Sequence, residues 1–154
     1  MADEYKPQQI EILLVDDNDD DVVLITESFR DSKFLNLVHV VNDGAEALAY
    51  LRHEGQYKSA VTPGLILLDI NMPKMNGFEV LAAMKADPQL RTIPVVMLTT
   101  STRDVDVARS YDSGACSFVS KPVDLEKLKE VVKQFALYWT LVSVVPPTRR
   151  IDTA

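Results

Sequence analysis

The chain has 154 residues, a length that allows one domain with a short appendage. Its 16 basic and 23 acidic residues give a formal net charge of −7, which argues against nucleic acid as a partner because phosphate binding requires clustered lysine and arginine. The single cysteine fits a reducing compartment, and no segment carries the roughly 20 apolar residues needed to cross a bilayer, so we expect a cytoplasmic protein without a membrane partner.

Short β-rich segments then alternate with longer amphipathic ones. In chain order we expect strands at residues 10–15, 37–41, 65–68, 94–98 and 117–120, and helices at about 19–31, 43–53, 78–86 and 103–113 and from Asp124 onward. Gly55 is expected to end the second helix in a left-handed conformation. Five strands alternating with five helices predict an α/β fold with a doubly wound, five-stranded parallel sheet, and right-handed crossovers favour the flavodoxin-like strand order 2-1-3-4-5.

The last helix carries an apolar stripe, because apolar residues recur at steps of three and four from Leu125 to Val142. A helix that continued to Val145 would span about 21 residues and ~31 Å, longer than the sheet beneath it can cover. We expect its end to form a partner-binding surface, that of a homodimer, although the end could instead fold back onto the body. The residues of this surface are Tyr138, Trp139, Leu141, Val142 and Val145. The expected domain covers residues 9–140, with the helix extending to 145, and residues 146–154 form a flexible tail.

Polar residues follow the expected strands at the points where the strands end. Asp16 and Asp17 come directly after the first strand, and Asp69 comes after the third. Thr99 follows the fourth strand and Lys121 the fifth. Because ligands of open α/β sheets bind beyond the carboxyl ends of the strands, we expect these side chains to converge on one rim.

Such a cluster is suited to accept a phosphoryl group. Three carboxylates held close together repel one another, and Mg²⁺ relieves that repulsion in a small site with few protein ligands. Asp69 is a potential nucleophile, like the carboxylates of enzymes that form aspartyl phosphates. The cation, Lys121 and the Thr99 hydroxyl would supply the positive charge and hydrogen bonds that phosphoryl oxygens require.

The neighbouring acidic residues and the two histidines have simpler interpretations. Asp19, Asp20 and Asp21 are interpreted as capping charges, because carboxylates stabilise a helix N-terminus. His39 and His53 lie on different elements, and no cysteine or acidic spacing completes a zinc pattern, so both are interpreted as structural.

Four sequence motifs surround the polar residues at the strand ends. They read LLVDDN (13–18), LILLDINMPKMNG (65–77), PVVMLTTS (94–101) and GACSFVSKP (114–122). The motifs and the gaps between them resemble the receiver domains of two-component response regulators, the CheY-like family, over about residues 9–138. The resemblance implies that Asp69 is the phosphorylated aspartate. It also implies that Asp16, Asp17 and Asp69 bind Mg²⁺ together with the backbone carbonyl of Asn71.

The same resemblance implies a switch mechanism. Lys121 would pair with the phosphoryl oxygens, and its bond to Pro122 would be cis. Thr99 would swing toward the phosphoryl group, and Phe118 would turn inward behind it. This coupling would carry the change to the face made by the fourth helix, fifth strand and fifth helix, where the homodimer is expected.

The chain is more specifically similar to the stand-alone receivers of bacterial phytochrome histidine kinases. This similarity rests on the elongated loop at 51–63 and on the aromatic C-terminal helix. It implies a sensor histidine kinase, of the phytochrome type, as the partner that phosphorylates Asp69. The domain would be no turnover enzyme and would catalyse only its own phosphotransfer and autodephosphorylation. With no output domain expected, signalling passes through protein contacts, or the domain serves as a phosphate sink.

A second function class is a phosphatase of the haloacid dehalogenase type, which also uses an aspartate nucleophile on a Rossmann-like sheet. That family carries its general acid two residues after the nucleophile, where this chain has Asn71. A nucleotide-binding enzyme fits less well, because the five glycines form neither a GxGxxG nor a Walker pattern.

Overall fold

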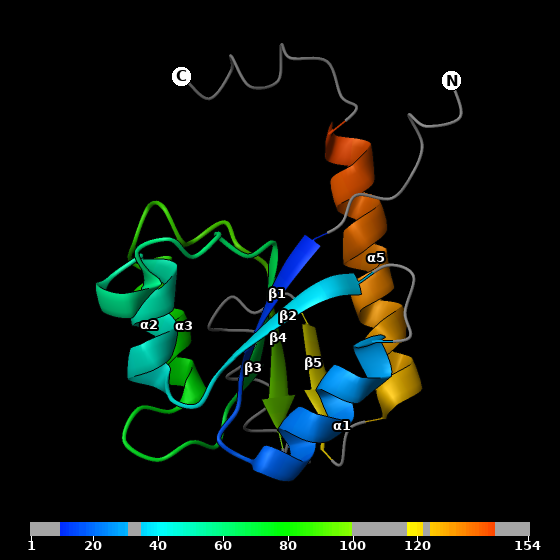
Figure 1. Cartoon of the computed structure of the whole chain (residues 1–154), viewed down its shortest axis with the longest axis horizontal. Helices are drawn as coiled ribbons and strands as arrows, with labels where there is room; N and C mark the ends of the chain where they lie inside the picture. The colour runs from blue at the N-terminus through cyan, green and yellow to red at the C-terminus, as the bar shows by residue number, and fades with distance from the viewer. Residues whose placement is uncertain (1–9, 31–34, 100–116, 122–123, 144–154) are drawn as a thin grey trace.

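The computed structural model describes residues 10–30, 35–99, 117–121 and 124–143, which form a parallel sheet flanked by helices (Figure 1). The strands are β1 (Ile10–Val15), β2 (Leu35–Val41), β3 (Leu65–Asp69), β4 (Val95–Thr99) and β5 (Ser117–Ser120). The helices are α1 (Asp19–Arg30), α2 (Gly44–Leu51), α3 (Gly77–Lys85) and α5 (Leu125–Ser143), with a 3-10 turn at Gly55–Tyr57. The helix expected at 103–113 lies outside the described residues.

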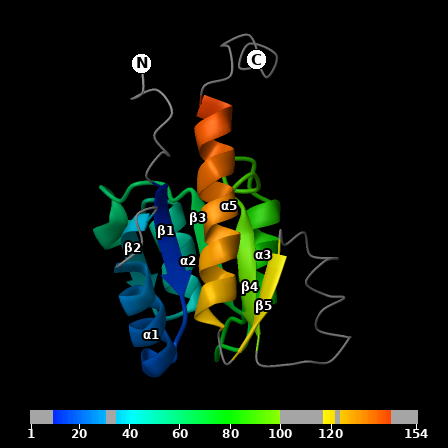
Figure 2. The ribbon, with the colours of Figure 1, turned by 90° about the vertical axis from the view of Figure 1, so that its right-hand side faces the viewer.

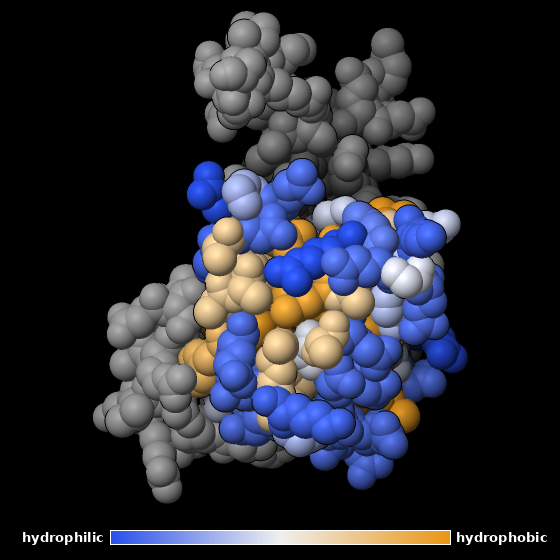
Figure 3. Space-filling model, turned by 90° about the vertical axis from the view of Figure 1, so that its left-hand side faces the viewer, coloured by the Kyte–Doolittle hydropathy of each residue, from blue (hydrophilic) through white to orange (hydrophobic). Residues whose placement is uncertain are grey.

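The strand order is β2-β1-β3-β4-β5 with every neighbouring pair parallel, which confirms the flavodoxin-like order expected from the sequence. Alternate residues of a strand face opposite sides of the sheet. On β1, Ile12 and Leu14 pack with α1 and α5, whereas Leu13 and Val15 pack with α2 and α3. Of the described helices, two therefore cover each face (Figure 1). Hydrophobic residues reach the surface between hydrophilic ones on the side of the molecule that carries α2 and α3 (Figure 3).

The end of α2 differs from the expectation. The left-handed residue that follows the helix is His53, with φ of 58°, whereas Gly55, with φ of 57°, opens the 3-10 turn. The helix ends at Leu51 because the chain turns back there and packs Tyr57 against the core. The Tyr57 hydroxyl donates to Glu46 Oε1 at 2.7 Å, which ties this loop to α2.

Helix α5 has 19 residues, a length of ~28 Å, and its C-terminal part extends beyond the amino ends of the strands (Figure 2). Its first half packs on the sheet through Leu128 and Val132, which are fully buried. The expected partner surface lies at the C-terminal end of this helix. Val145 and the tail at 146–154 lie outside the described residues, and the partner surface stays a prediction. Within the described ranges, no helix is both long and apolar enough to span a membrane.

Candidate functional site

Five polar residues singled out in the sequence lie at the carboxyl edge of the sheet, toward which β4 and β5 point in Figure 1. Asp16 and Asp17 follow β1, Asp69 ends β3, Thr99 ends β4, and Lys121 follows β5. The strand ends lie side by side because β1 pairs with β3, and β4 with β5, in an unbroken parallel register. The fold thus brings together residues that are far apart along the chain.

Three of these residues, Asp16, Asp17 and Asp69, form an acidic triad. One carboxylate oxygen of each lies within 4.8 Å of the other two. Asp16 and Asp69 are buried, whereas Asp17 is exposed. Carboxylates buried this close together require a compensating charge. Three oxygen donors with one solvent-facing member fit a hard divalent cation that retains several water ligands.

The pKa of the Asp69 carboxyl is raised from its ordinary value of 3.8 to about 7. Burial is the largest cause, because it penalises the charged form, and the negative charge of Asp16 adds to the effect. Lys121 and the backbone N–H of Asn71 act in the opposite direction, the N–H donating to Asp69 Oδ1 at 3.2 Å. The ionised form of Asp69 is therefore only partly compensated by the protein itself, and added positive charge would favour it.

Lys121 supplies the positive charge at this edge. Its Nζ atom lies 2.9 Å from Asp16 Oδ2, 2.8 Å from Asp21 Oδ2 and 3.4 Å from Asp69 Oδ1, and its side chain is 6% exposed. Burial works to lower the pKa of Lys121, but the hydrogen bonds to Asp21 and Asp16 and the charge of Asp69 together raise it above its usual value. The ammonium group therefore stays charged while buried.

Asp21 is a member of this cluster that the sequence motifs did not identify, because all three aspartates of the first turn of α1 fit the pattern of capping charges. A signal for it was present in the helical spacing. Asp21, Ile25 and Phe29 recur every four residues and share one face of α1, and Ile25 and Phe29 are buried. Asp21 therefore lies on the side of α1 that packs on the body of the domain.

The loop between β3 and α3 supports Asp69 through a close approach of the backbone. A Cβ atom at Gly77 would lie 2.6 Å from the carbonyl oxygen of Asp69 and 2.8 Å from the Cα of Ile70. Asn76 and Glu79 form a reciprocal capping box at this point, so α3 begins directly beside the acidic triad. Glycine at position 77 is what permits the helix to start so close to β3.

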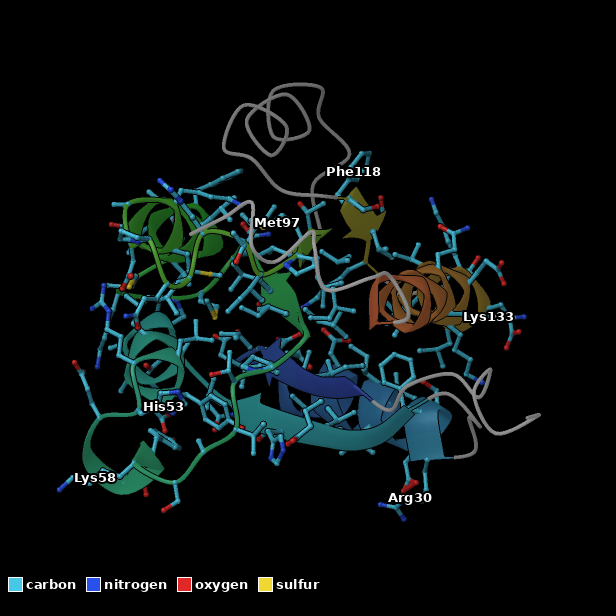
Figure 4. The ribbon with its side chains drawn as sticks, turned by 90° about the horizontal axis from the view of Figure 1, so that it is seen from above. Arg30, His53, Lys58, Met97, Phe118 and Lys133 are labelled. Atoms are coloured by element: carbon cyan, nitrogen blue, oxygen red, sulfur yellow. The ribbon has the colours of Figure 1, made fainter. Side chains whose placement is uncertain are left out.

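Thr99 and Phe118 lie where the sequence predicts them. Thr99 is 1% exposed at the end of β4, and its carbonyl accepts a hydrogen bond from the backbone N–H of Lys121 at 2.6 Å. Phe118 lies on β5, an edge strand of the sheet (Figure 4). Its side chain is partly buried and packs against the core cluster that α2 and α3 share with the sheet. Pro122 lies outside the described residues.

Comparison with known proteins agrees with this geometry. The family model of the response regulator receiver domain matches residues 12–133. The chain is 38% identical over 146 residues to response regulator Rcp1 of Synechocystis sp., which covers 95% of this chain and 99% of Rcp1.

Two solved structures are similar over most of the chain. The phosphorylated cyanobacterial phytochrome response regulator RcpA has a TM-score of 0.74 and 44% identity, covering 91% of this chain and 99% of RcpA. The Mn²⁺-bound form of Rcp1 has a TM-score of 0.73 and 37% identity, covering 89% of this chain and 99% of that one.

The matched segment contains the acidic triad, Thr99 and Lys121, and it includes every described strand from Ile12 onward. Receiver domains bind divalent metal, and accepting a phosphoryl group in signalling is typical of the family. The comparisons therefore select the receiver interpretation over the haloacid dehalogenase alternative. This chain belongs to the response regulator receiver domain family.

Proposed function

We propose that this chain accepts a phosphoryl group on Asp69 from the phosphohistidine of a sensor histidine kinase, in a reaction that requires Mg²⁺. The observation that best supports this is the setting of the Asp69 carboxylate. It is buried at a strand end, its oxygen lies within 4.8 Å of oxygens of Asp16 and Asp17, and Lys121 Nζ is 3.4 Å from its Oδ1.

In the transfer, a carboxylate oxygen of Asp69 attacks the phosphorus atom of the donor. A P–O bond forms, the P–N bond to the imidazole of the kinase breaks, and its electron pair stays on the imidazole nitrogen. Lys121 donates hydrogen bonds to the phosphoryl oxygens, and the buried hydroxyl of Thr99 donates another. Lys121 Nζ already lies 3.4 Å from Asp69 Oδ1, whereas Thr99 moves toward the phosphoryl group.

The residues that would hold the cation are Asp16, Asp17, Asp69 and, through its backbone carbonyl, Asn71. Mg²⁺ supplies positive charge that offsets both the triad and the equatorial oxygens of the phosphoryl group. Asp17 is the exposed member of the triad and leaves the solvent side of the site open. Asp16 is bound on both sides, since its Oδ1 accepts from the N–H of Asn18 and its Oδ2 from Lys121.

Phosphorylation is reversed by autodephosphorylation, in which water attacks phosphorus and the P–O bond to Asp69 breaks, releasing inorganic phosphate. In the phosphorylated state Thr99 moves toward the phosphoryl group and Phe118 turns inward behind it. This changes the surface of β5 and of the helices beside it. Signalling then passes through protein contacts, including a homodimer formed by the fourth helix, which lies outside the described residues, together with β5 and α5.

The kinase partner is proposed to be of the phytochrome type. The similar protein RcpA is a cyanobacterial phytochrome response regulator, and it is 44% identical to this chain. Phosphotransfer profiling with purified histidine kinases tests this pairing, with rapid transfer from a phytochrome kinase expected. Transfer from other kinases alone would contradict it.

The phosphoacceptor is tested with acetyl phosphate and Mg²⁺, followed by intact mass spectrometry. We expect one added phosphoryl group in the wild type, none in Asp69→Asn, and normal modification in Asp20→Asn, which removes an exposed aspartate near the site. Omitting Mg²⁺ is expected to prevent the modification. Phosphorylation that persists in Asp69→Asn, or continuous release of phosphate from unrelated phosphomonoesters, would contradict the proposal.

A further inference from the structure

Lys121 has one contact that the phosphotransfer chemistry does not use, a carboxylate on α1. Its Nζ lies 2.8 Å from Asp21 Oδ2 and 2.9 Å from Asp16 Oδ2, but 3.4 Å from Asp69 Oδ1. An ammonium group has three N–H donors, and this side chain is only 6% exposed, so three carboxylates occupy its hydrogen-bonding capacity. The two shorter contacts hold the ammonium away from the phosphoacceptor.

Asp21 differs from the other two carboxylates in its position. It is outside the triad whose oxygens converge, and its side chain is 21% exposed. It lies on the face of α1 that also carries the buried residues Ile25 and Phe29, so the packing of α1 fixes it against Lys121. The contact therefore joins α1 to the end of β5 without belonging to the proposed cation site.

We propose that Asp21 is a positioning residue that competes with the phosphoryl group for Lys121 and thereby slows phosphorylation of Asp69. This inference rests on the proposed function. To donate to a phosphoryl oxygen, the ammonium must share or give up the donor that now binds Asp21. A carboxylate at 2.8 Å also offsets part of the positive charge that Lys121 presents to the incoming group.

The test compares the rates at which full-length variants are phosphorylated by acetyl phosphate in Mg²⁺. Asp21→Asn keeps the shape of the side chain but removes its charge, and we expect the rate to rise about two- to fivefold, the range for a partly exposed ion pair. Asp21→Glu restores the charge and is expected to reverse most of that gain. Asp20→Asn is the matched control, because it removes the same charge from the same helical turn at an exposed position.

A second comparison asks whether Asp21 acts through the lysine. In a Lys121→Ala background, followed over longer reaction times, Asp21→Asn is expected to give no gain. A gain retained in that background, an equal gain in Asp20→Asn, or an unchanged or slower rate in Asp21→Asn would overturn the inference. A wild-type chain that acetyl phosphate does not modify, or modifies elsewhere than Asp69, would instead refute the proposed function.

Discussion

Replacing Asp69 with asparagine is expected to stabilise the metal-free protein at pH 8. Asp69 is 2% exposed, and the pKa of its carboxyl group is about 7 in the folded state against an ordinary value of 3.8. The folded state therefore holds this proton more tightly than the unfolded state does. By linkage, the stability associated with the protonated group is fully present below about pH 4 and is lost as the pH rises through about 7.

The magnitude follows from the size of the shift. A rise from 3.8 to about 7 corresponds to ~4 kcal/mol of unfolding free energy, at ~1.36 kcal/mol per unit. Asparagine is neutral and has nearly the shape of the protonated carboxyl, and the raised pKa is a net shift that already includes the contacts of the ionised form with Lys121 and with the N–H of Asn71. We therefore expect the Asp69→Asn variant to be about 4 kcal/mol more stable than the wild type at pH 8.

Urea unfolding of both proteins in the presence of a chelator measures this difference. At pH 4.5 the two free energies of unfolding are expected to differ by ~1 kcal/mol or less, because the penalty on the wild type has mostly disappeared there. Adding Mg²⁺ at pH 8 is expected to reduce the difference, since a cation that binds the folded wild type stabilises it. A difference that does not grow with pH, or a variant less stable than the wild type at pH 8, would refute the reasoning.

Three further predictions concern the loop, the cation and the partner surface. Gly77→Ala is expected to lower the free energy of unfolding by about 2–3 kcal/mol, because its Cβ would meet a backbone oxygen at 2.6 Å. Gly55→Ala is expected to lower it by about 1 kcal/mol, because only the positive φ of Gly55 opposes a side chain there. Equal losses of the two variants in urea unfolding would contradict this expectation. Asp17→Asn is expected to weaken Mg²⁺ binding at least tenfold in calorimetric titration, and wild-type affinity would remove Asp17 from the cation site. Trp139→Glu is expected to convert a homodimer to monomers in size-exclusion chromatography with light scattering, and an unchanged state would argue against the partner surface.

The parallel sheet and its carboxyl edge could be predicted because both follow from local signals, whereas the strand order came from analogy with flavodoxin-like folds of five βα units. Strand β3 is apolar at successive positions from Leu65 to Leu68, as a strand covered on both faces must be, and a carboxylate follows it directly. The parallel βαβ connection then places Asp69 at the same edge as Asp16 and Asp17. No contact needs to be known for this step.

Other features depended on contacts that no local pattern contains. Strand β2 begins at Leu35, two residues before the expected start, because a register shift lets Ile10 pair with Leu35. The left-handed residue after α2 is His53 and not a glycine, because the packing of Tyr57 decides where the chain turns. In both places the tertiary structure outweighed the conformational preference of the residues themselves.

The sequence by itself determined the layered sheet and which carboxylate, hydroxyl and ammonium groups stand at its edge, because apolar periodicity and strand ends can be recognised one segment at a time. Only the tertiary structure decided which of these groups touch. Lys121 and Asp16 are 105 residues apart, yet their side chains lie 2.9 Å from each other. Asp21 joins them because the helical phase of α1 is set by its packing on the sheet. A distance of this kind depends on how the register of the strands combines with the phase of the helix, and no single stretch of the chain contains that combination.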